Sequence, residues 1–143
     1  MANFQENSPA VQAHLQMSQS VIQRMANNCA SCKAWCIGLV SATLVVVADK
    51  GKPDFVLIAV VPTVLFLVLD TCYLALERRF RDSYNKFIKK LHHGDIVADD
   101  LYSMAPSGKF VSSFLESLRS FSIWPFYLTL LGMILLTQRL VTP

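Results

Sequence analysis

Residues 55–76 read FVLIAVVPTVLFLVLDTCYLAL and hold a single charged residue, Asp70, in 22 positions. About 20 consecutive apolar residues, in a helix that rises ~1.5 Å per residue, cross a hydrocarbon core of ~30 Å. A soluble surface helix of this length carries a polar stripe, and this stretch has none. The segment therefore predicts a membrane-spanning helix in an integral membrane protein.

The composition of the whole chain agrees with this interpretation. Of its 143 residues, 53% are hydrophobic and 16% are charged, whereas about 25% are charged in soluble domains. The first 33 residues are polar and rich in Gln and Asn, so we expect no secretory signal peptide there. We expect a single all-α membrane domain over residues 1–143.

Two further apolar segments predict spans on either side of this one. Residues 34–48 (AWCIGLVSATLVVVA) form the first span if the helix extends back past Lys33, whose ammonium can reach the lipid headgroups. Residues 121–137 (FSIWPFYLTLLGMILLT) form the third span, at the lower limit of length. Trp35 and Trp124 fit interfacial anchors. We expect three spans; the alternative is two spans, with the last segment lying in the interface.

The connecting segments predict the order of elements. Residues 49–54 (DKGKPD) form a tight turn, so the first two spans are an antiparallel hairpin. We expect Pro62 to bend the second span. The expected parts are a disordered tail at 1–8, a long helix at 9–48 that includes the first span, the second span continuing as a basic helix at 54–91, cytosolic helices and turns at 92–120, and the third span at 121–137.

The distribution of lysine and arginine predicts the orientation of the chain. With a hairpin, the N-terminal segment and the segment between spans two and three share one side of the membrane. That side carries ten basic residues and the other carries three, which predicts a cytoplasmic N-terminus and an external C-terminus. The ten are Arg24, Lys33, Arg78, Arg79, Arg81, Lys86, Lys89, Lys90, Lys109 and Arg119, and the three are Lys50, Lys52 and Arg139.

The N-terminal helix shows a start signal and a packing stripe. Ser8 is the expected N-cap and Pro9 the first helical residue. A stripe with heptad spacing predicts helix packing, either within the subunit or around an oligomer axis. The stripe is Val11, Leu15, Ser18, Ile22, Met25, Cys29, Cys32 and Cys36, of which Val11, Leu15, Ile22, Met25 and Cys29 are the candidate oligomer seam.

A second face of this helix carries uncharged amides where surface helices usually carry Glu and Lys. One interpretation is a solvated face. The other is that the amides line a water-filled lumen or form hydrogen bonds between helices. Together with Asp70 they are the candidate pore-lining residues: Gln12, Gln16, Gln19, Gln23 and Asn27.

Asp70 is a candidate functional residue in its own right. A charge near the middle of a bilayer costs about 2.5 kcal/mol or more, so an intramembrane carboxylate usually has a function. Asp70 could line a conduction path, pair with Lys33 or be protonated. Alternatively, it lies close enough to the interface to stay hydrated.

Residues 77–91 (ERRFRDSYNKFIKKL) predict a basic amphipathic helix next to the second span. Such a helix binds anionic headgroups, and each basic residue adds about 1 kcal/mol. An anionic ligand such as a nucleotide, or a cytosolic protein, is the alternative partner. Nucleic acid is disfavoured because the aromatic residues lack a base-stacking arrangement. The candidate residues are Arg78, Arg79, Arg81, Lys86, Lys89 and Lys90.

Two groups of potential metal ligands have simpler interpretations. Cys29 and Cys32 have CxxC spacing, but we expect them and Cys36 to be small packing residues, with S-acylation as the alternative. At residues 92–95 (HHGD), Gly94 is the expected helix C-cap and Asp95 would cap the next short helix. We expect no metal, no cofactor and no enzymatic activity.

The layout of a cytosolic helix, a two-span hairpin and the sequence LALERRFRDSY at residues 74–84 resembles small membrane effectors of bacterial anti-phage operons. These include two-span effectors beside nucleotide-signalling genes and pore-forming accessory proteins of RNA-targeting CRISPR systems. The resemblance covers residues 9–91, in organisation only. It implies a bacterial inner-membrane protein that oligomerises and perturbs membrane integrity.

Three spans are too few to enclose a pore within one subunit, so we expect a homo-oligomer. The functional prediction is a homo-oligomeric membrane channel or pore-forming effector, bound to membrane lipids and acting in anti-phage defence. The alternative is a non-conducting membrane scaffold or anchor that recruits a cytosolic partner. A membrane enzyme acting through His92, His93 and Asp95 is disfavoured.

Overall fold

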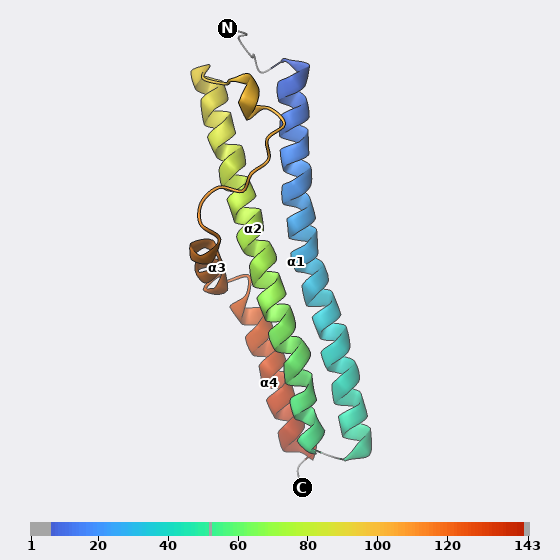
Figure 1. The fold of residues 1–143 in the computed structure, drawn as a ribbon. Coiled ribbons are helices and arrows are strands. Elements are labelled where there is room, and N and C mark those ends of the chain that lie inside the picture. Colours follow the sequence, from blue (N-terminus) through green and yellow to red (C-terminus); the bar gives the residue numbers. More distant parts are fainter. Residues whose placement is uncertain (1–6, 52, 142–143) are drawn as a thin grey trace.

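The computed structural model describes residues 7–51 and 53–141, and all of its regular elements are helices (Figure 1). The prediction of an all-α protein is confirmed for these residues. Residues 1–6 of the expected disordered tail, and Lys52, lie outside the described part of the chain. The elements are α1 (Pro9–Lys50), η1 (Pro53–Ala59), α2 (Val60–His93), η2 (Ala98–Asp100), α3 (Phe110–Leu118) and α4 (Trp124–Val141).

The long helix α1 begins and ends at strong local signals. Ser8 is its N-cap, and the Ser8 hydroxyl accepts a hydrogen bond from the Val11 amide at 3.3 Å. Pro9 fits the first position because the N–H that proline lacks would have no partner inside the helix. At the other end Gly51 adopts the left-handed conformation, with φ 61°, and its N–H donates to the Val47 carbonyl. α1 therefore runs two residues beyond the expected end at 48.

α1 and α2 form an antiparallel hairpin along the whole length of the molecule (Figure 1). The seven residues of η1 precede α2 as a 3-10 helix. Pro62 is the third residue of α2, where a backbone N–H needs no acceptor within the helix. A change from 3-10 to α-helix lies just before Pro62, and the expected bend of the span stays a prediction.

α4 lies beside the half of the hairpin nearest to its turn, so the N-terminal and C-terminal ends of the described chain lie at opposite ends of the bundle (Figure 1). α4 begins at Trp124, three residues later than expected, because Pro125 fits only the first turn of a helix. Residues 119–123 form turns instead.

Two apolar cores hold the bundle together. The larger core joins α1, η1 and α4 and contains Cys36, Val40, Leu44, Val47, Val56, Ala59, Ile123, Tyr127, Leu130 and Ile134. The smaller core lies at the opposite end of the hairpin and contains Val11, Phe87, Leu91, Ile96 and Leu101. Pro9–Lys50, Phe55–His93 and Trp124–Val141 are long and apolar enough to cross a membrane.

Candidate functional site

One polar cluster joins the three candidate spans. The Lys33 ammonium on α1 lies 2.5 Å from Asp70 Oδ2 on α2, and the Tyr127 hydroxyl on α4 donates to the same oxygen at 3.3 Å. Asp70 and Tyr127 are buried, whereas the Lys33 side chain is 23% exposed. Of the alternatives for Asp70, pairing with Lys33 is the one that the structure shows.

The burial of Asp70 makes this cluster energetically important. A carboxylate removed from water is stable only with a charge partner and hydrogen bonds. Asp70 Oδ2 has both, while Asp70 Oδ1 is buried with no hydrogen-bond partner among the described residues. The Cys29 thiol also donates to the Asp70 main-chain carbonyl, at 3.7 Å. Asp70 Oδ2 therefore links α1, α2 and α4 through Lys33 and Tyr127.

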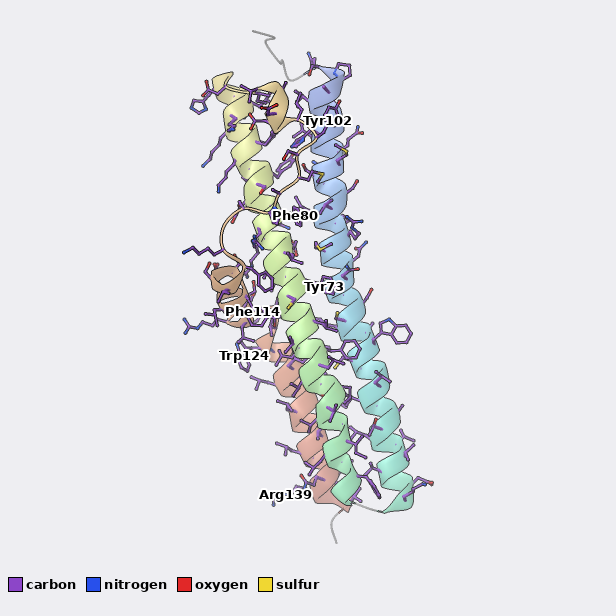
Figure 2. All side chains as sticks on the ribbon, in the orientation of Figure 1. Tyr73, Phe80, Tyr102, Phe114, Trp124 and Arg139 are labelled. Carbon is purple, nitrogen blue, oxygen red and sulfur yellow. The ribbon has the colours of Figure 1, made fainter. Side chains whose placement is uncertain are left out.

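The cluster marks one edge of the apolar part of the bundle. Lys33 is two residues from Trp35, and Tyr127 is three residues from Trp124, so both tryptophans lie near the level of Asp70. In Figure 2, Trp124 lies at the start of α4 and Arg139 near its end. At ~1.5 Å per residue, α4 is about 27 Å long, close to the ~30 Å of a hydrocarbon core. Asp70 therefore lies at the level of the first turn of α4, near the end of that helix marked by Trp124.

The amide face of α1 points out of the subunit. Gln12, Gln16, Gln19, Gln23 and Asn27 are all exposed. Gln23 donates to Asn27 at 2.9 Å, and Gln19 donates to the Tyr84 hydroxyl at 3.2 Å. Four of these amides line a shallow open groove of about 870 Å³. The structure thus separates the amides from Asp70, which is buried between the helices.

The predicted seam is used at least in part within the subunit. Val11 and Cys29 are buried, and Leu15, Ile22 and Met25 are half-buried. Val11 belongs to the smaller core, with Leu15 packed against it. Packing around an oligomer axis stays a prediction for these residues.

Four of the six candidate headgroup-binding residues have partners in the chain. Arg79 donates to the carbonyls of Pro106, Ser107 and Gly108 at 3.0–3.3 Å. The other pairs are Arg78 with Ser120 and Glu116, Arg81 with Glu77, and Lys90 with Asp100. Lys86 and Lys89 are exposed, and their ammonium groups form no ion pair or hydrogen bond with the described residues, so they are the free cations of this group.

The cysteines and the HHGD segment contain no metal-ligating cluster within the described residues. Cys29, Cys32 and Cys36 are buried free thiols, and Cys36 belongs to the larger core, as expected for packing residues. Gly94 is the left-handed C-cap of α2. The prediction for Asp95 is wrong, because η2 begins after Val97, whose amide donates to Asp100 instead.

Sequence reasoning missed a buried histidine at the end of the bundle away from the hairpin turn. His14 on α1 stacks on Phe87 with 4.1 Å between ring centroids, and its Nδ1 accepts the backbone N–H of Tyr102 at 3.1 Å. Tyr102 has a φ of 62°, in the left-handed region. The signal was the position of His14, three residues after Val11 and four before Ser18 on the buried face. His14 and Phe87 border a cavity of about 270 Å³.

The His14 contact predicts a pH-dependent local stability. Burial lowers the pKa of His14, and nearby Asp100 opposes this only in part. Hydrogen bonding to Lys90 lowers the pKa of Asp100, so Asp100 stays ionised near neutral pH. His14 is harder to protonate in the folded chain than in the unfolded chain. Its contribution to the stability of this end of the bundle is therefore complete above the unfolded pKa of about 6.5 and is lost as pH falls below that value.

As the pH is lowered from about 7.5 to 5.5, we expect the Tyr102 amide to lose protection against hydrogen exchange, measured relative to its intrinsic exchange rate at each pH. Protonation of Nδ1 removes the acceptor of that N–H. The matched control is His14→Asn, which offers an oxygen near the position of Nδ1 but does not titrate. Protection that stays constant in the wild type, or that falls equally in His14→Asn, would contradict this assignment.

No protein-family model, curated protein or solved structure matches this chain.

Proposed function

We propose that the protein is a homo-oligomeric membrane channel or pore-forming effector, with subunits that meet along the exposed face of α1. The observation that carries this proposal is the continuity of that face. Where Gln12 to Asn27 end, the same helical spacing continues through small exposed residues into the apolar half of α1. These are Ala30, Ala34, Gly38 and Ala42.

The two halves of this face suit a second copy of the same helix. Small residues let helix backbones approach closely in a membrane, and amides form hydrogen bonds between helices. A Cβ placed on Gly38 would have open space around it, so the neighbouring surface is unoccupied within the subunit. An amide both donates and accepts, so identical amide faces complement each other.

A conduction path would then lie between subunits. Within the described subunit the three spans pack on one another, and Asp70 is closed in by Lys33 and Tyr127. The amides lie on the N-terminal side of Lys33, so in this arrangement they surround the cytosolic mouth of the pore. In this arrangement Asp70 has a structural role, because it holds the helices of one subunit together.

The proposed setting is a bacterial inner membrane, with the N-terminus in the cytoplasm and the C-terminus outside. The basic residues of α2 support this orientation, because positive charge favours the cytoplasmic side. The resemblance in organisation to anti-phage effectors suggests defence as the biological role.

Liposome flux tests this function. We expect Gln16→Leu and Gln23→Leu to change ion flux severalfold while expression and oligomer mass persist, because each removes a polar group from the mouth. Asn85→Leu is the matched control, since Asn85 is an exposed amide on α2. We expect Gly38→Leu to lower the oligomer mass by blocking close helix approach. Wild-type flux in both glutamine variants would refute the pore.

A non-conducting scaffold is the second candidate. The observation in its favour is that Val97 and Tyr102 are 57% and 61% exposed in the segment after α2. Such apolar side chains could contact a cytosolic protein. Liposomes that stay sealed with the purified wild type, together with capture of a partner that is lost in a Val97→Ser and Tyr102→Ser double variant, would support this candidate.

A further inference from the structure

α3 has three distinct sides. Its inner side faces α2 and contains the buried Ser117. At 100° per residue, Val111 and Leu115 share a second side, and Ser112 and Glu116 share the third. Val111 is 68% and Leu115 55% exposed. An apolar side left uncovered next to a polar side is typical of a helix at a membrane interface.

The turn after α3 extends this apolar side towards the third span. Phe121 is 88% exposed and Trp124 42% exposed. Figure 2 shows Phe114 of α3 and Trp124 next to each other along the bundle. Trp124 is three residues before Tyr127, which donates to Asp70. The uncovered side chains therefore lie at the boundary of the apolar layer, continuous with the exposed Leu128 of α4.

The charges around α3 favour a lipid as the occupant. Lys109 precedes α3, Arg119 follows it, and both are exposed. Two cations that flank an apolar side match the negative phosphates above the acyl chains. A soluble protein docked here would have to occupy a level at which the adjoining span already faces lipid.

α3 is also fixed to α2. Arg78 donates to Ser120 at 3.0 Å, and Arg79 holds the three carbonyls that precede α3 while its guanidinium lies 5.8 Å from the Phe110 ring. A nine-residue helix would be unstable alone in water. These contacts present its apolar side in a fixed position.

We propose that α3 and residues 119–124 form a lipid-binding wedge in the headgroup layer of the cytoplasmic leaflet, with Val111, Leu115 and Phe121 inserted among the phospholipids. This inference rests on the membrane insertion in the proposed function and is independent of conduction. Because the wedge occupies one leaflet, it enlarges the cross-section of the protein on the cytoplasmic side.

Fluorescence quenching by brominated lipids tests the wedge in vesicles of anionic phospholipid. In a background with Trp35→Phe and Trp124→Phe, the added tryptophan comes from Leu115→Trp or from Ser112→Trp one turn earlier on the polar side. We expect lipid brominated near the headgroup to quench Leu115→Trp severalfold more than Ser112→Trp. We also expect Lys109→Glu with Arg119→Glu to weaken that quenching.

A fourth variant separates the two proposals. Trp124→Phe leaves Trp35 as a reporter of insertion of the first span. Quenching of Trp35 combined with equal or absent quenching at positions 112 and 115 would overturn the wedge and leave the channel proposal intact. Absence of quenching at Trp35 as well would refute membrane insertion, and both proposals with it.

Discussion

Lys33→Met is expected to lower the free energy of unfolding by about 3–5 kcal/mol, because it leaves the buried Asp70 carboxylate without its counter-ion. The remaining partner, the Tyr127 hydroxyl, donates one hydrogen bond and carries no charge. Unfolding in mixed micelles, followed by circular dichroism, measures this change. We expect the variant to lose most of its stability margin, since native proteins are stable by about 5–15 kcal/mol.

Replacing the other partner, Asp70, should lower the free energy of unfolding by less. In Asp70→Asn, the amide oxygen still accepts from Tyr127, and the partly exposed Lys33 can extend its ammonium towards the headgroups. We expect a loss of about 1–2 kcal/mol, in the range of one buried hydrogen bond.

The double variant Lys33→Met, Asp70→Leu is the critical control. It removes both charges together, and an apolar replacement of a buried pair is often neutral. We therefore expect it to recover most of the stability lost in Lys33→Met. With Asp70→Leu as the matching single variant, a loss in the double variant equal to the sum of the two single losses would show that the two side chains are not coupled.

The second large effect is expected at Arg79. Its guanidinium holds the carbonyls of Pro106, Ser107 and Gly108, and hydrogen bonds to a charged group contribute about 1.5–3 kcal/mol. We expect Arg79→Ala to release the segment before α3, with a local opening free energy lower by about 2–3 kcal/mol. Hydrogen exchange of residues 104–118 measures it.

Two matched variants sharpen this test. Arg79→Lys keeps the charge, but one ammonium lacks the planar fork that reaches several carbonyls, so we expect an intermediate loss of protection. Arg81→Ala removes an exposed ion pair with Glu77 and should cost only about 0.3–0.5 kcal/mol. Equal exchange in Arg79→Ala and Arg81→Ala would mean that Arg79 does not hold the segment.

Local signals predicted the helical elements well. Ser8, Pro9 and Gly94 mark helix ends through backbone geometry that their own side chains favour, so sequence alone located these ends. The start of α4 was missed by three residues because apolar composition set the expected boundary, whereas Pro125 sets the observed one. The 3-10 helix η1 has no comparable signature.

The site was predictable only in part. Lys33 and Asp70 stand 37 residues apart, and their pairing was one of several alternatives because it depends on the register between α1 and α2. Tyr127 lies 57 residues after Asp70, and nothing in the sequence links the two. Arg79 donates to main-chain carbonyls, which every residue has, so the sequence does not indicate which residues accept these hydrogen bonds. The side chains of one helix could be assigned to faces, but their partners on other helices could not.

Because Tyr127 lies 57 residues after Asp70, the polar cluster is completed only after the hairpin has been made. Lys33 and Asp70 can meet once α1 and α2 have been made, but the larger core then still lacks Ile123, which precedes α4, and Tyr127, Leu130 and Ile134 of α4. Packing of α4 against the hairpin is then the step that closes the bundle around Asp70. A chain cut before α4 would leave the Asp70 carboxylate without the Tyr127 hydroxyl and one side of the larger core uncovered, so α4 completes a fold that the hairpin alone leaves open.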